Sequence, residues 1–148
     1  MKIVIDTNVL ISGIFYSGPP YEILCKWWEG KLDILITNKM LEEYKRVGIK
    51  LSDKFPGLDI IGILDLIERK SEIIEIRIKV GNVCSDPDDD KFIECAINGD
   101  CKIIISGDKH ILSVSGYKKI HILKPRDFVD KYLKTLNFEL ILTTRKGG

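Results

Sequence analysis

Acidic residues follow two short apolar segments of this chain, at the points where β-strands are expected to end. Asp6 follows the apolar run 2–5, and Asp108 comes shortly after the run 102–105. In an open α/β sheet, ligands bind outside the carboxyl ends of the strands. Carboxylates gathered at that edge repel one another unless a cation joins them. The pattern therefore predicts a site for a hard divalent metal ion and, with it, a phosphate-containing substrate.

Two further acidic groups lie between these points. Glu42 and Glu43 fall on an expected helix, where one carboxylate can lean toward the sheet, and spacing does not choose between them. In the string from 86 to 90, one aspartate can cap the next helix and one can sit in a turn. Asp90 is well placed to point at the strand ends, because it lies at the start of a helix with an apolar inner face. The string lacks the glycine and the final glutamate of an EF-hand loop.

Other polar residues beside these acids could bind substrate or water. The Ser106 hydroxyl could hold a water or a phosphate oxygen, and Asn8 could hydrogen-bond a phosphate or cap a helix. His110 and His121 are the only histidines, and neither has a partner at a useful spacing. Without a placed histidine or cysteine base, we expect the chemistry to rest on metal-activated water.

The bulk composition limits the class of protein. A chain of 148 residues with 45% hydrophobic and 30% charged residues is typical of one globular domain. No apolar run approaches the ~20 residues of a membrane helix, and the segment 1–6 does not resemble a signal peptide. We therefore expect a cytoplasmic protein with no membrane partner. The 4 cysteines form no C-x-x-C pair, which favours buried thiols over a zinc site. A net charge of +1 says little about nucleic-acid binding.

Short β-prone segments alternate with helical patterns along the chain. We expect strands at 2–5, 32–36, 73–76, 102–105 and 119–123. We expect helices at 9–14, 20–29, 38–47, 58–69, 88–98 and 125–133. This alternation predicts right-handed β-α-β crossovers and a mostly parallel sheet covered on both faces. The expected organisation is a single domain over 1–148, with a core at about 2–134 and a tail at 135–148 that includes a β-prone run.

Four segments of the chain, taken together, resemble the PIN domain, the nuclease fold shared by VapC-type toxins. They are Asp6–Leu10, Leu41–Tyr44, Asp86–Ala96 and Ile105–Lys109. Each segment alone is a weak signal, but the order and the distances between them are specific. The resemblance runs from Lys2 to about Lys131 and is closest to the branch of prokaryotic toxin components.

The resemblance implies an α/β/α sandwich, three layers around a mostly parallel sheet of about five strands. It also implies cleavage of single-stranded RNA with Mg²⁺ or Mn²⁺, an antitoxin protein as a possible partner, and a homodimer. Carried over by position, it assigns the catalytic and metal-binding roles to Asp6, Glu43, Asp90 and Asp108, with Asn8 and Ser106 lining the site. Glu43 is preferred over Glu42 because the family places its acid directly before a stretch like 44–47. The chain departs from the family at Gly48–Ile49, where related chains tend to have a leucine.

Basic residues near these motifs are candidates for contacts with the RNA backbone. They are Lys45, Arg46, Lys50, Lys109 and Arg126. Two other functions stay open. A haloacid-dehalogenase-like phosphatase also begins with a strand and an aspartate, but it needs a second acid where this chain has Asn8. A PIN-like domain that only binds RNA or protein usually loses some of the acids, whereas this chain keeps all of them.

Overall fold

The computed structural model describes residues 1–134, whose strands form one parallel sheet. The strands are β1 (Lys2–Ile5), β2 (Asp33–Ile36), β3 (Glu72–Ile73), β4 (Ile103–Ile105) and β5 (His121–Leu123). Their order across this 5-stranded sheet is β3-β2-β1-β4-β5, and every pairing is parallel. The predicted α/β fold with a parallel sheet is confirmed.

The strand order changes direction at β1, which is the central strand. From β1 the chain first builds β2 and β3 on one side, and then returns to build β4 and β5 on the other side. The β1–β4 register pairs Ile5 with Ile105, and the backbone N–H of Asp6 donates to the Ile105 carbonyl at 3.0 Å. A ligand site is expected where adjacent crossovers diverge in this way. The residues that follow β1 and β4 are therefore held beside each other at that point.

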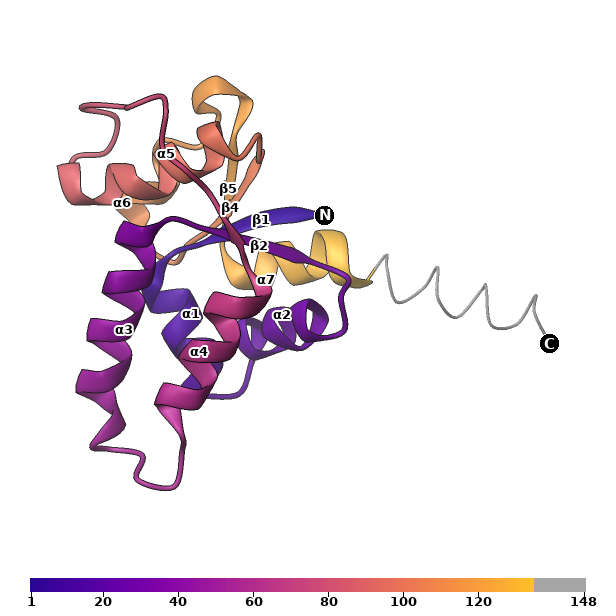
Figure 1. Ribbon diagram of the computed structural model, residues 1–148. Coiled ribbons are helices and arrows are strands. Elements are labelled where there is room, and N and C mark those ends of the chain that lie inside the picture. Colours follow the sequence, from indigo (N-terminus) through magenta and orange to yellow (C-terminus); the bar gives the residue numbers. More distant parts are fainter. Residues whose placement is uncertain (135–148) are drawn as a thin grey trace.

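Helices cover both faces of the sheet. They are α1 (Thr7–Phe15), α2 (Pro19–Trp28), α3 (Asn38–Ser52), α4 (Ile60–Lys70), α5 (Asp90–Asn98), α6 (Lys109–Leu112) and α7 (Pro125–Phe128), with single turns η1 (Pro87–Asp89), η2 (Tyr117–Lys119) and η3 (Val129–Leu133). In Figure 1, α5 lies on one side of the strands, and α1, α2 and α4 lie on the other. Within residues 1–134, no helix combines the length and the apolar character needed to cross a membrane.

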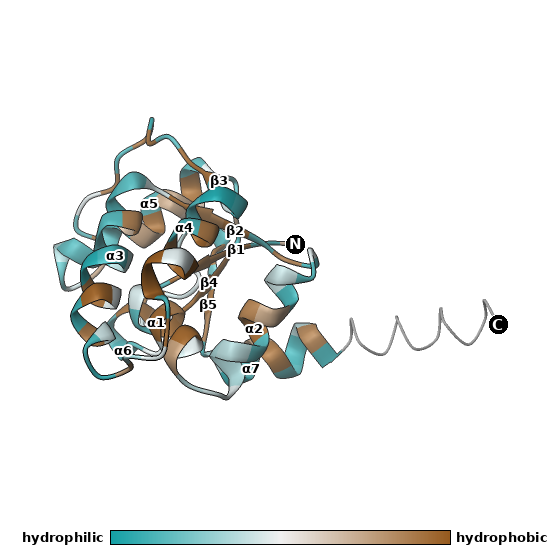
Figure 2. Cartoon of the chain, turned by 60° about the horizontal axis from the view of Figure 1, so that its bottom comes forward, coloured by the Kyte–Doolittle hydropathy of each residue, from teal (hydrophilic) through white to brown (hydrophobic). Residues whose placement is uncertain are grey.

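The hydrophobic core lies between the sheet and these helices. Ile3, Val4 and Ile34 are fully buried, although neighbouring residues of a strand face opposite sides of the sheet. Both faces are therefore covered, as parallel sheets require. Figure 2 shows hydrophobic residues along the strands and on the helix faces turned toward them. Each fully buried isoleucine contributes about 1.5–3 kcal/mol to folding, so the strands form a firm base for the residues at their ends.

Some boundaries differ from the predicted ones. Helix α1 begins at Thr7, because the Asp6 carboxylate accepts a hydrogen bond from the Val9 N–H and caps the helix. Strand β3 spans only Glu72–Ile73, and β5 begins at His121, because Lys118 and Lys119 adopt positive φ in the preceding turn. The β-prone run expected in the tail lies outside the described residues, and the single-domain organisation stays a prediction.

Helix α3 continues past Gly48 to Ser52, beyond the predicted end. A Cβ at Gly48 would lie 3.4 Å from side-chain atoms of Ile60 and Leu64 on α4. The absence of a side chain there lets α4 pack closely on α3. The departure from the family pattern at this position is therefore a packing feature of the helix pair.

Candidate metal and nucleic-acid site

Asp6 stands at the end of the central strand and is 3% exposed. One carboxylate oxygen accepts from the Val9 N–H at 2.9 Å, and the other accepts from the Ser106 hydroxyl. Burial raises the pKa of Asp6, and the nearby Asp108 carboxylate raises it further, although the hydrogen bonds from Ser106 and Val9 oppose this change. Burial and the Asp108 charge thus destabilise the ionised form of Asp6, and a nearby cation would stabilise it.

Asp108 follows β4 and caps the short helix α6. Its carboxylate accepts from the His110 N–H at 2.8 Å, and its own N–H donates to the Ser106 hydroxyl oxygen at 3.0 Å. Ser106 is fully buried. Its hydroxyl therefore donates to Asp6 and accepts from the Asp108 backbone, so one side chain links both strand ends. The sequence predicted Ser106 beside the acids, and in the structure it contacts Asp6 and Asp108 through these two hydrogen bonds.

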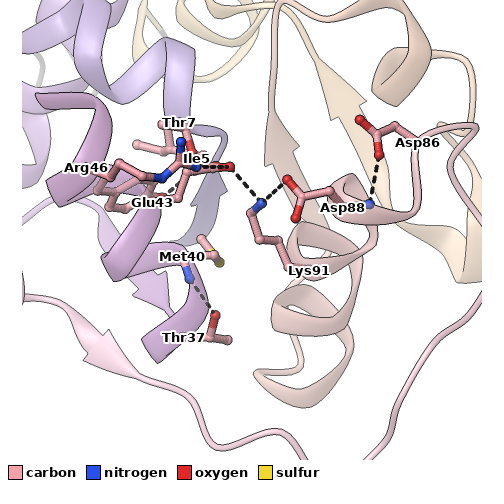
Figure 3. A network of polar contacts seen from close by, with 10 residues as sticks. Ile5, Thr7, Thr37, Met40, Glu43, Arg46, Asp86, Asp88 and Lys91 are labelled. Carbon is pink, nitrogen blue, oxygen red and sulfur yellow. Dashed lines mark hydrogen bonds and ion pairs between the residues drawn. The ribbon is translucent and has the colours of Figure 1, made fainter. Parts of the chain in front are cut away.

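Glu43 reaches the same region from α3, and two protein donors hold its carboxylate. Oε2 accepts from the Thr7 hydroxyl, and Oε1 lies 2.8 Å from the Lys91 ammonium. The next residue, Tyr44, is buried and donates its hydroxyl to the Ile5 carbonyl, which anchors α3 against β1. Figure 3 shows Glu43 between Thr7 and Lys91. Glu42 is exposed on the helix surface, so the geometry favours Glu43 of the two.

The aspartate string is divided among different tasks. Asp86 caps the turn η1 by accepting from the Asp88 N–H at 3.0 Å, and Asp88 pairs with Lys91 at 2.8 Å. Asp90, the residue predicted for the site, is 5% exposed, and its carboxylate accepts from the Cys84 N–H at 2.7 Å. It holds the preceding loop against α5 and does not line the acidic cavity. Asp89 lines that cavity in its place.

Asp89 was not singled out from sequence because helical spacing does not separate it from Asp90. Both residues have helical backbone angles, and both lie one turn before the apolar face of α5. Burial, together with the charges of Asp86 and Asp108, raises the pKa of Asp89 to about 6. The structure thus favours Asp89 as the third aspartate of the site. Asp90 does not line the cavity, and its role in the site stays a prediction.

These acids meet in one small hollow at the carboxyl ends of β1 and β4. Its volume is about 120 Å³, and it is lined by Asp6, Thr7, Asn8, Glu43, Val47, Asp89, Phe92, Asp108 and Ile111. An all-oxygen set of carboxylate, hydroxyl and amide groups suits Mg²⁺ or Mn²⁺ better than softer metals. Among residues 1–134, no three Asp, Glu, His or Cys side chains are already arranged to hold an ion.

Comparison with known proteins identifies the family of this chain. The family model described as PIN domain matches residues 2–110. The chain belongs to the PIN-domain family. It is also 34% identical over 150 residues to an uncharacterized protein of Methanocaldococcus jannaschii, covering 93% of this chain and 95% of that protein. PIN domains form a nuclease superfamily that typically uses divalent metal ions, and this membership favours a nuclease over a phosphatase.

Two larger hollows adjoin the acidic cavity of this PIN domain. One, of about 560 Å³, shares Asn8 and Asp108 with it and adds Lys109 and His110. The other, of about 360 Å³, shares Glu43 with the cavity. Its basic lining residues are Lys39, Arg46 and Lys91. The acids therefore lie between two hollows that each present basic side chains beside acidic ones.

Some of the basic residues that were predicted to contact the RNA backbone line these hollows, and others do not. Arg46 and Lys109 line the adjoining hollows, whereas Lys45 pairs with Glu68 on α4 at 3.5 Å. Lys50 and Arg126 line neither hollow. Sequence reasoning also missed Lys91. A lysine three residues after Asp88 on a helix could have indicated an ion pair. Its contact with Glu43, however, depends on how α3 and α5 pack.

Burial lowers the pKa of Lys91, but hydrogen bonds to Asp88 and Glu43 outweigh that effect and leave the pKa above its ordinary value. The ammonium therefore stays charged at neutral pH. The site as a whole contains buried or half-buried carboxylates on one side and a buried cation against one of them. Such an arrangement of unlike charges is common at functional sites.

Proposed function

We propose that this PIN domain is a metal-dependent endoribonuclease that cleaves single-stranded RNA with Mg²⁺ or Mn²⁺. One observation carries the proposal. Acids from separate parts of the chain line a single small cavity at the carboxyl ends of the two central strands: Asp6, Glu43, Asp89 and Asp108. Separate caps or solvated helix faces would not bring these side chains to one place.

Each acid has a role that fits its surroundings. Asp6, Asp89 and Asp108 are the residues that would hold the ion, because Glu43 already lies against a cation, the Lys91 ammonium. An ion held by these carboxylates would supply activation of a water molecule and stabilisation of the charge that develops on the phosphate. Ser106 keeps Asp6 and Asp108 together, and Glu43 borders the space where a water would lie. In-line hydrolysis would leave a 5′-phosphate and a 3′-hydroxyl.

The adjoining hollows support a single-stranded substrate. A cavity of about 120 Å³ is large enough to admit a phosphate group. A strand that crosses it would pass Lys109 and His110 on one flank and Arg46 and Lys39 on the other. Contacts of this kind are electrostatic and weaken with salt. We extend the proposal to a cytoplasmic toxin with an antitoxin partner and a homodimeric state, which are expectations from the family.

A second function is a PIN domain that binds RNA without cleaving it. It is favoured by one observation: the Lys91 ammonium already lies 2.8 Å from the Glu43 carboxylate at the edge of the cavity. Under that alternative, Lys91 and the hydrogen bonds to Asp6 would be permanent substitutes for an ion.

Cleavage of a fluorescent unstructured RNA separates the two functions. With Mn²⁺, the wild-type protein should cleave and leave 5′-phosphate ends. Asp6→Asn and Asp89→Asn should each lower the rate by at least about 100-fold, whereas Lys26→Met on α2, remote from the cavity, should cleave normally. Binding of the RNA without cleavage by the wild-type protein would support the second function, and full activity of Asp6→Asn would contradict the first.

A further inference from the structure

Lys91 is a buried lysine that connects two elements of the acidic site. Its side chain is 7% exposed, and its ammonium lies 2.8 Å from Glu43 Oε1 on α3 and 2.8 Å from Asp88 Oδ2 in η1. Figure 3 shows the ammonium between the two carboxylates. Lysine is almost never buried unless it is paired, because removing its charge from water costs several kcal/mol. This cost indicates that the position of the ammonium is specific.

Both oxygens of Glu43 are taken up by protein donors. Thr7 donates to Oε2, and Lys91 donates to Oε1. Arg46 approaches Glu43 only to 3.7 Å, and its side chain is 74% exposed, so it adds little. The orientation of Glu43 is thus set by Thr7 and Lys91 before any ion is present. Asp6, Asp89 and Asp108 have no ion pair with Lys91 among the contacts of residues 1–134.

We propose that Lys91 is a positioning residue that holds Glu43 at the edge of the acidic cavity and, through its charge, limits how tightly the cavity binds a divalent ion. The inference rests on the proposed metal site. Two effects of opposite sign follow from it. Loss of the ammonium makes the cavity more negative by one charge, which strengthens binding of a divalent cation. The same loss frees Glu43 from its place, which slows cleavage.

Lys91→Met tests both effects, because methionine keeps the apolar stem and removes the charge. Titration calorimetry with Mn²⁺ should show binding tighter by about tenfold, the size expected for the loss of one unit charge beside a partly solvated site. RNA cleavage at saturating Mn²⁺ should fall by at least about tenfold. Lys91→Arg, which keeps the charge, should stay within about threefold of the wild type in Mn²⁺ affinity.

Lys26→Met is the matched control. Lys26 also pairs with an acid three residues away, at 3.4 Å from Glu29, and its side chain is 18% exposed, but it lies on α2. It should change neither Mn²⁺ affinity nor cleavage. Thermal unfolding gives a second measurement: with EDTA the Lys91→Met protein should melt below the wild type, and Mn²⁺ should raise its melting temperature more than it raises that of the wild type.

Each outcome decides the inference. Unchanged or weaker Mn²⁺ binding by Lys91→Met, with the same loss of melting temperature with and without Mn²⁺, would reduce Lys91 to a structural ion pair. If Lys91→Met does not fold, Lys91→Gln replaces it, and unchanged or weaker Mn²⁺ binding by Lys91→Gln would likewise show that Lys91 is only a structural ion pair. A wild-type protein that binds Mn²⁺ but does not cleave RNA would overturn the nuclease and leave the affinity effect of Lys91 standing. Absence of Mn²⁺ binding in both wild type and variants would overturn both proposals.

Discussion

Ser106→Ala is the substitution whose effect the structure defines most closely. The Ser106 hydroxyl donates to the Asp6 carboxylate and accepts from the Asp108 N–H at 3.0 Å. Alanine leaves both groups without this partner and adds no bulk. A buried polar group left unpaired costs about 1–3 kcal/mol, and the Asp108 N–H is only partly buried, so we expect a loss of about 2–3 kcal/mol in the free energy of unfolding.

The loss should depend on pH in a known direction. Burial already raises the pKa of Asp6, and the hydrogen bond from Ser106 opposes that rise, so alanine raises the pKa further. A carboxyl group whose pKa is raised by folding loses stability as pH increases through the ordinary range and up to the raised value. Ser106→Ala should therefore be most damaging at pH 8 and less so at pH 5, where Asp6 takes up a proton more readily.

Urea unfolding in EDTA at pH 8 and pH 5 measures the free energy of unfolding, and thermal unfolding in the same buffers gives the melting temperature. At about 2–4 °C per kcal/mol for a chain of this size, the melting temperature at pH 8 should fall by about 4–12 °C. Ser106→Thr, which keeps the hydroxyl, is the control and should lose less at both pH values. An equal loss at pH 5 and pH 8 would refute the view that Ser106 acts on the ionised form of Asp6.

Two further substitutions test other parts of the site. Asp89→Asn removes a carboxyl group whose pKa is raised to about 6, so in EDTA it should stabilise the protein on the order of 1 kcal/mol at pH 8 and not at pH 4. It should also abolish Mn²⁺ binding, and a variant that binds Mn²⁺ as the wild type does would remove Asp89 from the site. Tyr44→Phe breaks the hydrogen bond to Ile5 and should cost about 1–2 kcal/mol in urea unfolding; an unchanged midpoint would show that α3 is held by apolar packing alone.

The fold and two of the acids could be predicted from the sequence because they depend on local patterns. Apolar runs that end in Asp6 and Asp108 define strand ends, and parallel crossovers bring the carboxyl ends of strands to one edge. The pairing of Ile5 with Ile105 then puts the two acids side by side. Spacing alone left Glu42 and Glu43 equal, and the choice of Glu43 came from the family resemblance.

The remaining details depend on tertiary packing, which local patterns do not contain. Asp89 lines the cavity, whereas the Asp90 carboxylate accepts from the Cys84 N–H. Helical spacing fits both residues, and the loop that brings the Cys84 N–H to Asp90 is positioned only by the tertiary fold. The contact between Lys91 and Glu43 likewise exists only because α5 and α3 pack at one end of the sheet.

A crystal structure with Mn²⁺ tests the central claim most directly, since anomalous scattering places the ion without assumptions about its ligands. We predict a peak in the hollow between the Asp6, Asp89 and Asp108 carboxylates, with Glu43 still bonded to Thr7 and Lys91. An ion bound elsewhere on the protein, or a peak that is the same in the Asp6→Asn variant, would contradict the assignment of this cavity as the metal site.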